Sequence, residues 1–247
     1  MIEIYADGAA MNGILEASKN KDIKGFTTNP SLMRSAGVTN YLDFCNEVIP
    51  MLKSERPDTN ISLEVFADDF DGMYRQALKL HNLSEKYKYD VFVKIPVTNT
   101  MGTNTAPLIA MLLASGVKVN VTAVFTPAQT ETIVKAIGDS QVKSIISIFA
   151  GRIADSGKNA VNITKECISQ NKFPITGMLK NKNIKFLWAS TRQVYNYNEA
   201  IEAGCDIITM TPDIIKKMNL MGKNLTDYSL ETVKMFYNDA LKSGYTI

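Results

Sequence analysis

Histidine and cysteine are scarce in this sequence, and their scarcity removes several kinds of catalytic site. The 247 residues include one histidine and three cysteines. A Ser-His-Asp or Cys-His site would have to use His81, which lies in the middle of the helical pattern MYRQALKLHNLSEKY. Zinc sites built on several histidines or paired cysteines are excluded for the same reason. Any chemistry must therefore use lysine, carboxylates, amides and hydroxyls.

Long hydrophobic runs and basic clusters are also missing. The apolar stretch LIAMLLASGVKVNV reaches Lys118 too soon to span a bilayer. The net charge is +2, which gives no reason to expect nucleic acid as a partner. The N-terminal MIEIYADG lacks the basic start and apolar core of a signal peptide. Cys45, Cys167 and Cys205 are far apart and odd in number, so we expect free thiols in a reducing cytoplasm and no membrane partner.

No linker rich in glycine or serine divides the chain. Short β-rich segments alternate instead with helical patterns. Strands are predicted at residues 2–7, 23–29, 61–67, 90–96, 117–125, 142–151, 184–190 and 206–211. Eight strand-then-helix units favour a single α/β domain of residues 1–247, a (β/α)8 TIM barrel with an additional C-terminal helix.

Polar residues stand where the predicted strands end. In parallel barrels the carboxyl ends of the strands carry the active site. The residues at these ends are Asp7, Thr27, Asn29, Glu64, Lys94, Asn120, Thr122, Ser147, Arg152, Ser190 and Arg192. Because alternate residues of a strand share a face, we expect many of these side chains to meet in one ring.

Each of these residues also has a purely structural interpretation. Asp7 before a glycine could cap a helix or turn, and Asn29 before a proline is typical of a helix start. Glu64 could be no more than the ion-pair partner of Lys94. Arg152 and Arg192 could be solvated loop residues. Their recurrence at equivalent places in successive units favours a shared site.

Lys94 places an ammonium group within an apolar strand. In DVFVKIP, Val91, Val93 and Ile95 share one face of the predicted strand, and Lys94 shares the other with Phe92. A desolvated ammonium is costly unless it is paired or loses its proton. A neutral amine can attack a ketone and form a protonated Schiff base, which allows cleavage of a neighbouring carbon–carbon bond. Asp7 and Glu64 could supply the acid and base that this chemistry needs.

Motifs along nearly the whole chain resemble the transaldolase family. The matching stretches are ADGA, GFTTNPSLM, LEVFADD, VKIPVTN, NVTAVFTPAQ, SIFAGRIADSG, WASTRQ and AGCDIITMTPDII. The resemblance implies a barrel enzyme of the metal-free Schiff-base class, with no cofactor and with sugar phosphates as substrates. Such an enzyme transfers a dihydroxyacetone unit from a ketose phosphate to an aldose phosphate in the pentose phosphate pathway.

The resemblance also implies a role for each residue. Lys94 matches the Schiff-base lysine, Asp7 the acid/base at the carbon–carbon bond, and Glu64 with Thr122 the pair that handles the catalytic water. Asn29 and Asn120 match binders of substrate and intermediates, with Thr27 beside them. The positions that match the phosphate end of the substrate are Ser147, Arg152, Ser190 and Arg192.

Two positions separate the branches of this family. Fructose-6-phosphate aldolases resemble this sequence but typically have glutamine in place of Glu64 and tyrosine in place of Phe149. Both residues here therefore favour a transaldolase. The alternatives are such an aldolase, a transaldolase for another anionic sugar such as a sulfonate, and a non-catalytic protein that binds sugar phosphates.

The C-terminal segment predicts self-association. Leu230, Val233, Phe236, Tyr237 and Leu241 form an apolar stripe on a helix after the eighth strand. We expect part of this stripe to cover the barrel and the rest to form an interface in a homo-oligomer. The chain length is nearest to that of the small family members, which form pentamers or decamers.

Overall fold

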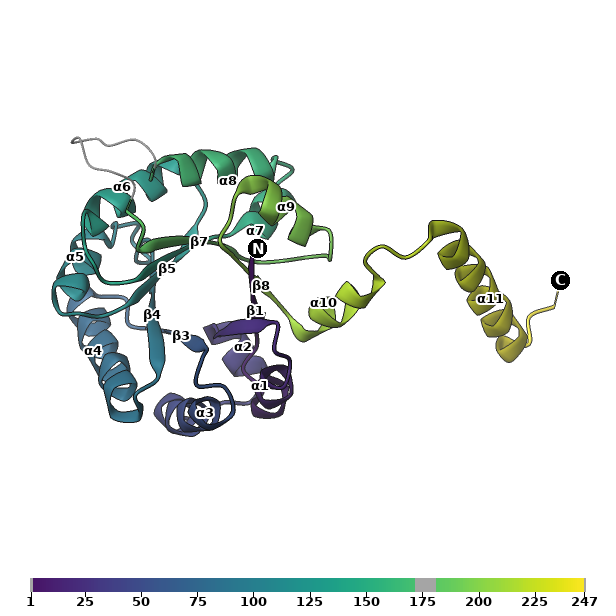
Figure 1. Cartoon of the computed structure of the whole chain (residues 1–247), viewed down its shortest axis with the longest axis horizontal. Helices are drawn as coiled ribbons and strands as arrows, with labels where there is room; N and C mark the ends of the chain where they lie inside the picture. The colour runs from purple at the N-terminus through teal and green to yellow at the C-terminus, as the bar shows by residue number, and fades with distance from the viewer. Residues whose placement is uncertain (1, 172–180, 247) are drawn as a thin grey trace.

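Eight parallel strands close into a barrel. The computed structural model describes residues 2–171 and 181–246. The strands are β1 (Glu3–Asp7), β2 (Ile23–Thr27), β3 (Asn60–Glu64), β4 (Asp90–Pro96), β5 (Val119–Val124), β6 (Ser144–Ile148), β7 (Ile184–Trp188) and β8 (Ile207–Met210). Neighbours in sequence are neighbours in the sheet, and β8 pairs with β1. The predicted α/β barrel and all eight of its strands are confirmed (Figure 1).

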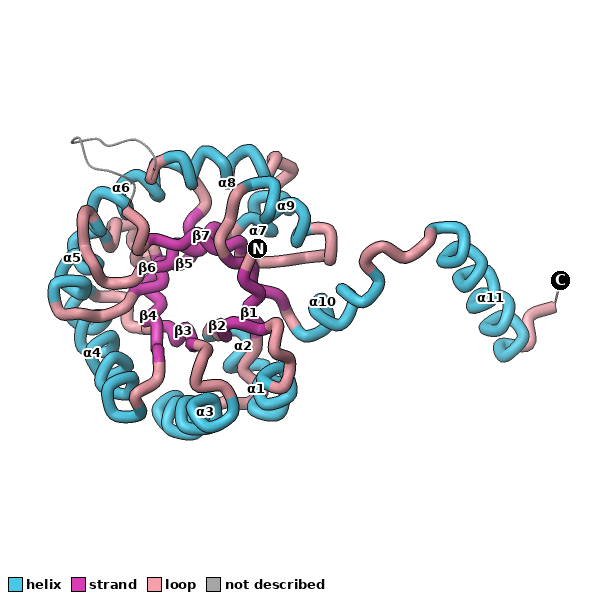
Figure 2. The backbone as a smooth tube through the Cα atoms, viewed as in Figure 1, coloured by secondary structure: helices cyan, strands magenta, loops and turns pink. Residues whose placement is uncertain are grey.

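Helices surround this ring of strands, except for the C-terminal helix α11 (Figure 2). They are α1 (Met11–Ser18), α2 (Pro30–Ser35), α3 (Tyr41–Glu55), α4 (Phe70–Tyr87), α5 (Ala106–Ala114), α6 (Pro127–Ile137), α7 (Ala150–Asp155), α8 (Ala160–Ser169), α9 (Asn196–Ala203), α10 (Pro212–Lys217) and α11 (Leu225–Ser243), with a 3-10 turn at Met218–Leu220. His81 lies half-buried on α4, so its predicted position within a helix is confirmed.

The two faces of the strands pack into two separate apolar clusters. On β4, Val91, Val93 and Ile95 join the large cluster between strands and helices. Phe92 points into the barrel, where it packs in a smaller cluster that also contains Tyr5, Ile145, Leu187, Ala189 and Ile207. Gly25 is required beside this cluster, because a Cβ atom there would lie 2.6 Å from the ring of Tyr5. The apolar floor leaves the carboxyl ends of the strands for polar side chains.

The C-terminal helix α11 departs from the sequence-based expectation. It lies away from the barrel at the end of an extended connection (Figure 1), and none of its residues is buried. The stripe of Leu230, Val233, Phe236, Tyr237 and Leu241 is 52% to 65% exposed. The expectation that part of the stripe covers this chain's own barrel is therefore wrong. The eighth strand is followed by the short helix α10, and the connection from residues 218 to 224 carries α11 outwards.

Candidate active site

A cavity of about 470 Å³ opens at the carboxyl ends of the strands. The predicted site residues that line it are Asp7, Thr27, Asn29, Glu64, Lys94, Thr122, Ser147, Phe149, Arg152, Ser190 and Arg192. They come from seven different strand units. The sequence-based prediction that these side chains meet in one place is thus met for all of them except Asn120.

Lys94 lies at the base of this cavity between two acceptors. Its Nζ atom is 2.9 Å from Oε2 of Glu64 and donates a hydrogen bond of 2.6 Å to the backbone oxygen of Thr28. The side chains of Lys94 and Glu64 are 7% and 15% exposed. The sequence predicted an apolar enclosure, but the enclosure also contains a carboxylate and a carbonyl that accept from the ammonium. Before Nζ can attack a carbonyl carbon it must lose a proton, and Glu64 lies within reach of that proton.

Asp7 is the second carboxylate in the cavity and is half-buried. The Thr27 hydroxyl donates a hydrogen bond of 2.7 Å to its Oδ1 atom. Burial raises the pKa of Asp7, and the charge of Glu64 raises it further, against the opposing effects of the Thr27 hydrogen bond and the Lys94 charge. A carboxylate with a raised pKa is better able to take up a proton near neutral pH.

Asn29 both caps a helix and lines the cavity. Its Oδ1 atom accepts from the backbone N–H of Leu32 at 3.0 Å and so caps the first turn of α2. The same side chain lines the cavity. Capping fixes the orientation of the amide, which leaves the NH2 group as the part that a ligand could engage.

Asn120 lies beneath the cavity instead of on its wall, which differs from its predicted role as a direct binder. It is fully buried. Its Nδ2 donates to the Ser62 hydroxyl at 3.1 Å, and its Oδ1 accepts from the Ser147 hydroxyl at 2.7 Å. Asn120 therefore positions Ser147, which does line the cavity. Ser62 was missed by sequence reasoning, although it shares a strand face with Glu64 and could have been found by that parity.

The end of β5 carries a local irregularity that aims Thr122. Ala123 has a left-handed backbone with φ of 59°, and the pairing of β5 with β6 shifts between Val121 and Val124. Such bulges re-aim side chains near active sites. The Thr122 hydroxyl is buried without a hydrogen-bond partner among the described residues. It therefore remains available to a ligand in the cavity.

Two arginines stand at the outer part of the cavity in different states. Arg152 lies with its guanidinium carbon 5.5 Å from the centre of the Phe149 ring. Arg192 is bound to Asp155, with Nη2 and Nε at 2.6 and 3.0 Å from Oδ2. Asp155 was not predicted from the sequence. Of the two guanidiniums, that of Arg152 is the one without a carboxylate partner in the described parts of the chain.

Ser190 is held in place by a close backbone approach. It has a left-handed φ of 65°, which is rare for residues other than glycine. A Cβ atom on Gly151 would lie 1.6 Å from the Ser190 carbonyl oxygen. Gly151 therefore allows the turn after β7 to pack against the start of α7. This packing brings Ser190 and Arg192 to the same cavity as Arg152.

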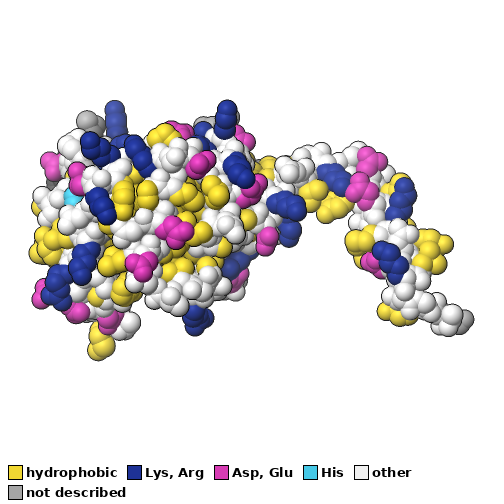
Figure 3. All heavy atoms as spheres, turned by 90° about the horizontal axis from the view of Figure 1, so that it is seen from below, with side chains coloured by type: hydrophobic (Ala, Val, Ile, Leu, Met, Phe, Trp, Pro, Cys, Tyr) yellow, Lys and Arg dark blue, Asp and Glu magenta, His cyan; other side chains and the backbone are white. Residues whose placement is uncertain are grey.

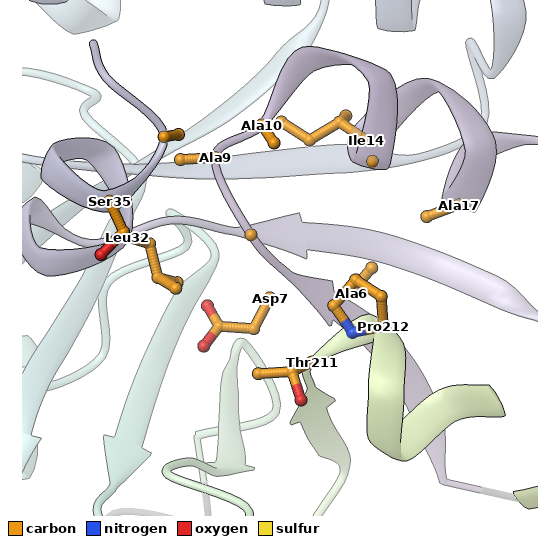
Figure 4. A pocket seen from close by; sticks show the side chains of 13 residues that line it. Ala6, Asp7, Ala9, Ala10, Ile14, Ala17, Leu32, Ser35, Thr211 and Pro212 are labelled. Atoms are coloured by element: carbon orange, nitrogen blue, oxygen red, sulfur yellow. The ribbon is translucent and has the colours of Figure 1, made fainter. Parts of the chain in front are cut away.

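A separate groove borders the other side of Asp7. It has a volume of about 280 Å³ and lies between α1, α2 and the start of α10 (Figure 4). Small apolar side chains such as Ala9, Ala10 and Ala17 dominate its walls. Lys94 and Glu64 do not line it, so the polar cavity is the one equipped for chemistry.

The described residues form neither a metal-binding cluster nor a membrane-spanning helix. Within residues 2–171 and 181–246, no group of three histidine, cysteine, aspartate or glutamate side chains is placed to hold a metal ion. Among the helices in those ranges, none has the length and apolar character needed to cross a membrane.

The fold resembles those of several solved barrels. A monomeric dihydrodipicolinate synthase variant matches with a TM-score of 0.60 and 11% identity, covering 97% of this chain and 79% of that one. The 3-hexulose-6-phosphate synthase of Salmonella typhimurium matches with a TM-score of 0.53 and 13% identity, covering 85% and 89%. At these identities the likeness shows the fold alone. Fold and site together define a (β/α)8 barrel with a lysine–carboxylate centre at its strand ends.

Sequence comparison identifies the family. The chain belongs to the Transaldolase/Fructose-6-phosphate aldolase family, whose profile matches residues 4–246. A probable transaldolase of Caldicellulosiruptor saccharolyticus is 30% identical, covering 93% of this chain and 94% of that protein. A probable transaldolase of Bartonella tribocorum is 29% identical over the full length of both chains. Membership places the chain among aldolase and aldol-transferase enzymes, as the sequence motifs predicted.

Proposed function

We propose that this protein is a transaldolase that transfers a dihydroxyacetone unit between sugar phosphates through a Schiff base on Lys94. The observation that carries the proposal is the position of Lys94 Nζ, 2.9 Å from the Glu64 carboxylate and in the same cavity as Asp7. A site that only binds sugar phosphates has no need of a buried amine paired with a carboxylate. Sedoheptulose 7-phosphate and fructose 6-phosphate are the proposed donors, and the protein is proposed to act in the cytoplasm.

The reaction begins at the donor ketone. Nζ of Lys94 gives up a proton to Glu64 and attacks the C2 carbonyl carbon, and the resulting carbinolamine loses water to form an iminium ion. Glu64 and the free Thr122 hydroxyl hold the carbinolamine hydroxyl group, and the proton that Glu64 took from Lys94 lets it leave as water. Asp7 then takes the proton of the C4 hydroxyl. The C3–C4 electron pair moves into the iminium, so an aldose leaves and a three-carbon enamine stays on Lys94.

Transfer is completed by the reverse sequence on a second aldehyde. The enamine carbon forms a bond to the acceptor carbonyl carbon, and Asp7 returns its proton to the carbonyl oxygen. Water then hydrolyses the iminium and restores the free amine. Asn29 and Ser147 are proposed to hold the substrate hydroxyls, supported by the hydrogen bonds of Thr27 to Asp7 and of Ser147 to Asn120. Arg152, Ser190 and Arg192 are proposed to bind the phosphate end.

A direct test is a transfer assay with fructose 6-phosphate and erythrose 4-phosphate. We expect sedoheptulose 7-phosphate to form, and free dihydroxyacetone to stay a minor product. The basic residues recognise an anion and not phosphorus as such. A parallel assay with an acceptor whose phosphate is replaced by a sulfonate therefore tests the sulfonated-sugar alternative.

Phe149 is proposed to keep protonation and hydrolysis of the enamine slow, so that the enamine reacts with an acceptor instead. Its ring lines the cavity, 5.8 Å from the Phe125 ring and beside Arg152. Because phenylalanine has no hydroxyl, it can neither protonate the enamine nor anchor a water molecule. We expect Phe149→Tyr to raise dihydroxyacetone release by about one to two orders of magnitude, the lower range for a positioned acid or base. Product analysis without acceptor measures this release.

The neighbouring ring supplies a matched control for this variant. Phe125→Tyr also adds a phenol hydroxyl, but Phe125 does not line the cavity, so its release rate should stay at the native level. If the native enzyme already releases dihydroxyacetone as fast as it transfers it, the protein is an aldolase and this interpretation of Phe149 is wrong.

Arg152 is proposed to bind the substrate anion directly. A charge-assisted hydrogen bond contributes roughly 1.5–3 kcal/mol, so Arg152→Ala should raise KM for phosphorylated substrates about ten- to a hundredfold. Unphosphorylated acceptors should lose less. The exposed Arg75→Ala on α4 is the control for loss of a surface arginine. Equal losses on both kinds of substrate would assign Arg152 a structural role.

We also propose that copies of this chain associate through α11. A stripe of five large apolar side chains is exposed along the projecting helix (Figure 3), and patches of this kind mark interaction sites. Light scattering should give a multiple of the chain mass of 27.3 kDa, and Phe236→Ser with Leu241→Ser should lower the mass towards that of one chain. Thr232→Ser on the same helix is the control. A native mass of a single chain would contradict the proposal.

A further inference from the structure

Strand β8 contributes one side chain to the Asp7 environment to which neither the sequence analysis nor the proposed mechanism gives a role. Thr209 lies on β8 opposite Tyr5 of β1 and lines the catalytic cavity. Its hydroxyl oxygen is 2.6 Å from that of Thr27. Thr27 in turn is 2.7 Å from Oδ1 of Asp7. Three side chains from β1, β2 and β8 thus form a short chain of hydrogen bonds.

The donor and the acceptor of each of these two hydrogen bonds follow from the number of hydrogens available. A threonine hydroxyl has one hydrogen to donate, and an ionised carboxylate can only accept. When Asp7 is ionised, the Thr27 hydrogen must point to Asp7. The Thr27 oxygen can then meet the Thr209 hydroxyl only as an acceptor, so Thr209 must be the donor of the second bond.

We propose that Thr209 is a positioning residue that fixes the Thr27 hydroxyl in the orientation that donates to Asp7. The inference rests on the proposed role of Asp7 as the base of carbon–carbon bond cleavage. Thr27 and Thr209 are 3% and 5% exposed, so bulk water does not replace a missing donor. In such surroundings successive hydrogen bonds polarise and strengthen one another.

The charged groups around Asp7 come from other strands. Glu64 on β3 and Lys94 on β4 act on its pKa through their charges, and Arg152 and Arg192 line the far part of the same cavity. The described side chains of β2 and β8 that line the cavity, Thr27 and Thr209, add hydroxyl groups and no charge. A change at Thr209 therefore alters hydrogen bonding to Asp7 without altering the charge of the site.

The test compares Thr209→Val, which keeps the shape and removes the donor, with Thr209→Ser, which keeps the donor. The full-length protein is labelled with ¹³C at aspartate carboxyl groups, and the Asp7 signal is assigned by its loss in Asp7→Asn. Cooperative strengthening of the charge-assisted bond to Asp7 by about 10–30% predicts that Thr209→Val raises the Asp7 titration midpoint by about 0.1–0.7 pH unit. The acid limb of kcat/KM should move by the same amount, and Thr209→Ser should restore both.

Two controls keep this result specific. Thr164→Val removes another fully buried hydroxyl, on α8 and without a partner in the described residues, and should leave the Asp7 midpoint unchanged. Thr209→Ala replaces Thr209→Val if the valine variant does not fold. An unchanged Asp7 midpoint in Thr209→Val, or a shift that Thr209→Ser does not reverse, would overturn the inference. The titration needs no turnover, so its outcome is separate from that of the proposed transaldolase activity.

Discussion

Replacing Lys94 with methionine should abolish transfer, with a loss in kcat/KM of about 10⁴-fold or more, as expected when an enzyme loses its nucleophile. Methionine fills a similar volume but has no amine to form the Schiff base. The residual rate should equal that of the background reaction. Lys118→Met is the matched control, because Lys118 forms an ion pair with Asp90 outside the catalytic cavity.

The same substitution should also change stability, for a reason that lies in the ion pair. Removing Lys94 leaves the mostly buried Glu64 carboxylate without its cation, and breaking a buried pair costs roughly 3–5 kcal/mol. The double variant Lys94→Met with Glu64→Gln removes both charges and should recover much of that loss. Chemical denaturation separates this effect from catalysis. Turnover by Lys94→Met clearly above the uncatalysed rate would contradict the assigned nucleophile.

Asp7→Asn should slow carbon–carbon bond cleavage by about 10²–10⁴-fold, the range for loss of a general base. In the proposed mechanism imine formation depends on Lys94, Glu64 and Thr122, so the variant should still form a Schiff base with the ketose. Single-turnover measurements separate the two steps. An equal loss of imine formation and cleavage would show that Asp7 acts before the bond breaks.

The pH dependence of the native enzyme should reflect the raised pKa of Asp7. In the proposed mechanism cleavage needs the ionised carboxylate, so activity should fall as the pH drops through the Asp7 pKa, which lies above the ordinary value for aspartate. Between the unfolded and folded pKa values the native state binds more protons at Asp7, so its contribution to stability is lost as pH rises. Asp7→Asn lacks this loss and should gain stability relative to the native protein over that window, as urea denaturation across pH would measure.

The fold could be predicted from the sequence because one pattern repeats eight times. Each β-rich segment is followed by a helical pattern, and each predicted strand is present, with the polar residues at the end where a parallel barrel brings them together. Alternation along β4 also predicted that Val93 faces the helices while Phe92 and Lys94 point inwards.

What the sequence could not predict depends on contacts between distant segments. Asn120 does not line the cavity, and its amide is held by Ser62 of β3 and Ser147 of β6. Arg192 is bound by Asp155, which lies 37 positions earlier in the chain. The position of α11 depends on the connection after α10, where no periodic pattern indicates whether the helix turns back to its own barrel.

The central claim is the Schiff base on Lys94, and borohydride trapping tests it most directly. The native protein is incubated with fructose 6-phosphate, reduced with borohydride, digested and examined by mass spectrometry. Our account predicts a stable adduct on the peptide that contains Lys94, present in Asp7→Asn and missing in Lys94→Met. An adduct on a different lysine, or none on a protein that still catalyses transfer, would contradict it.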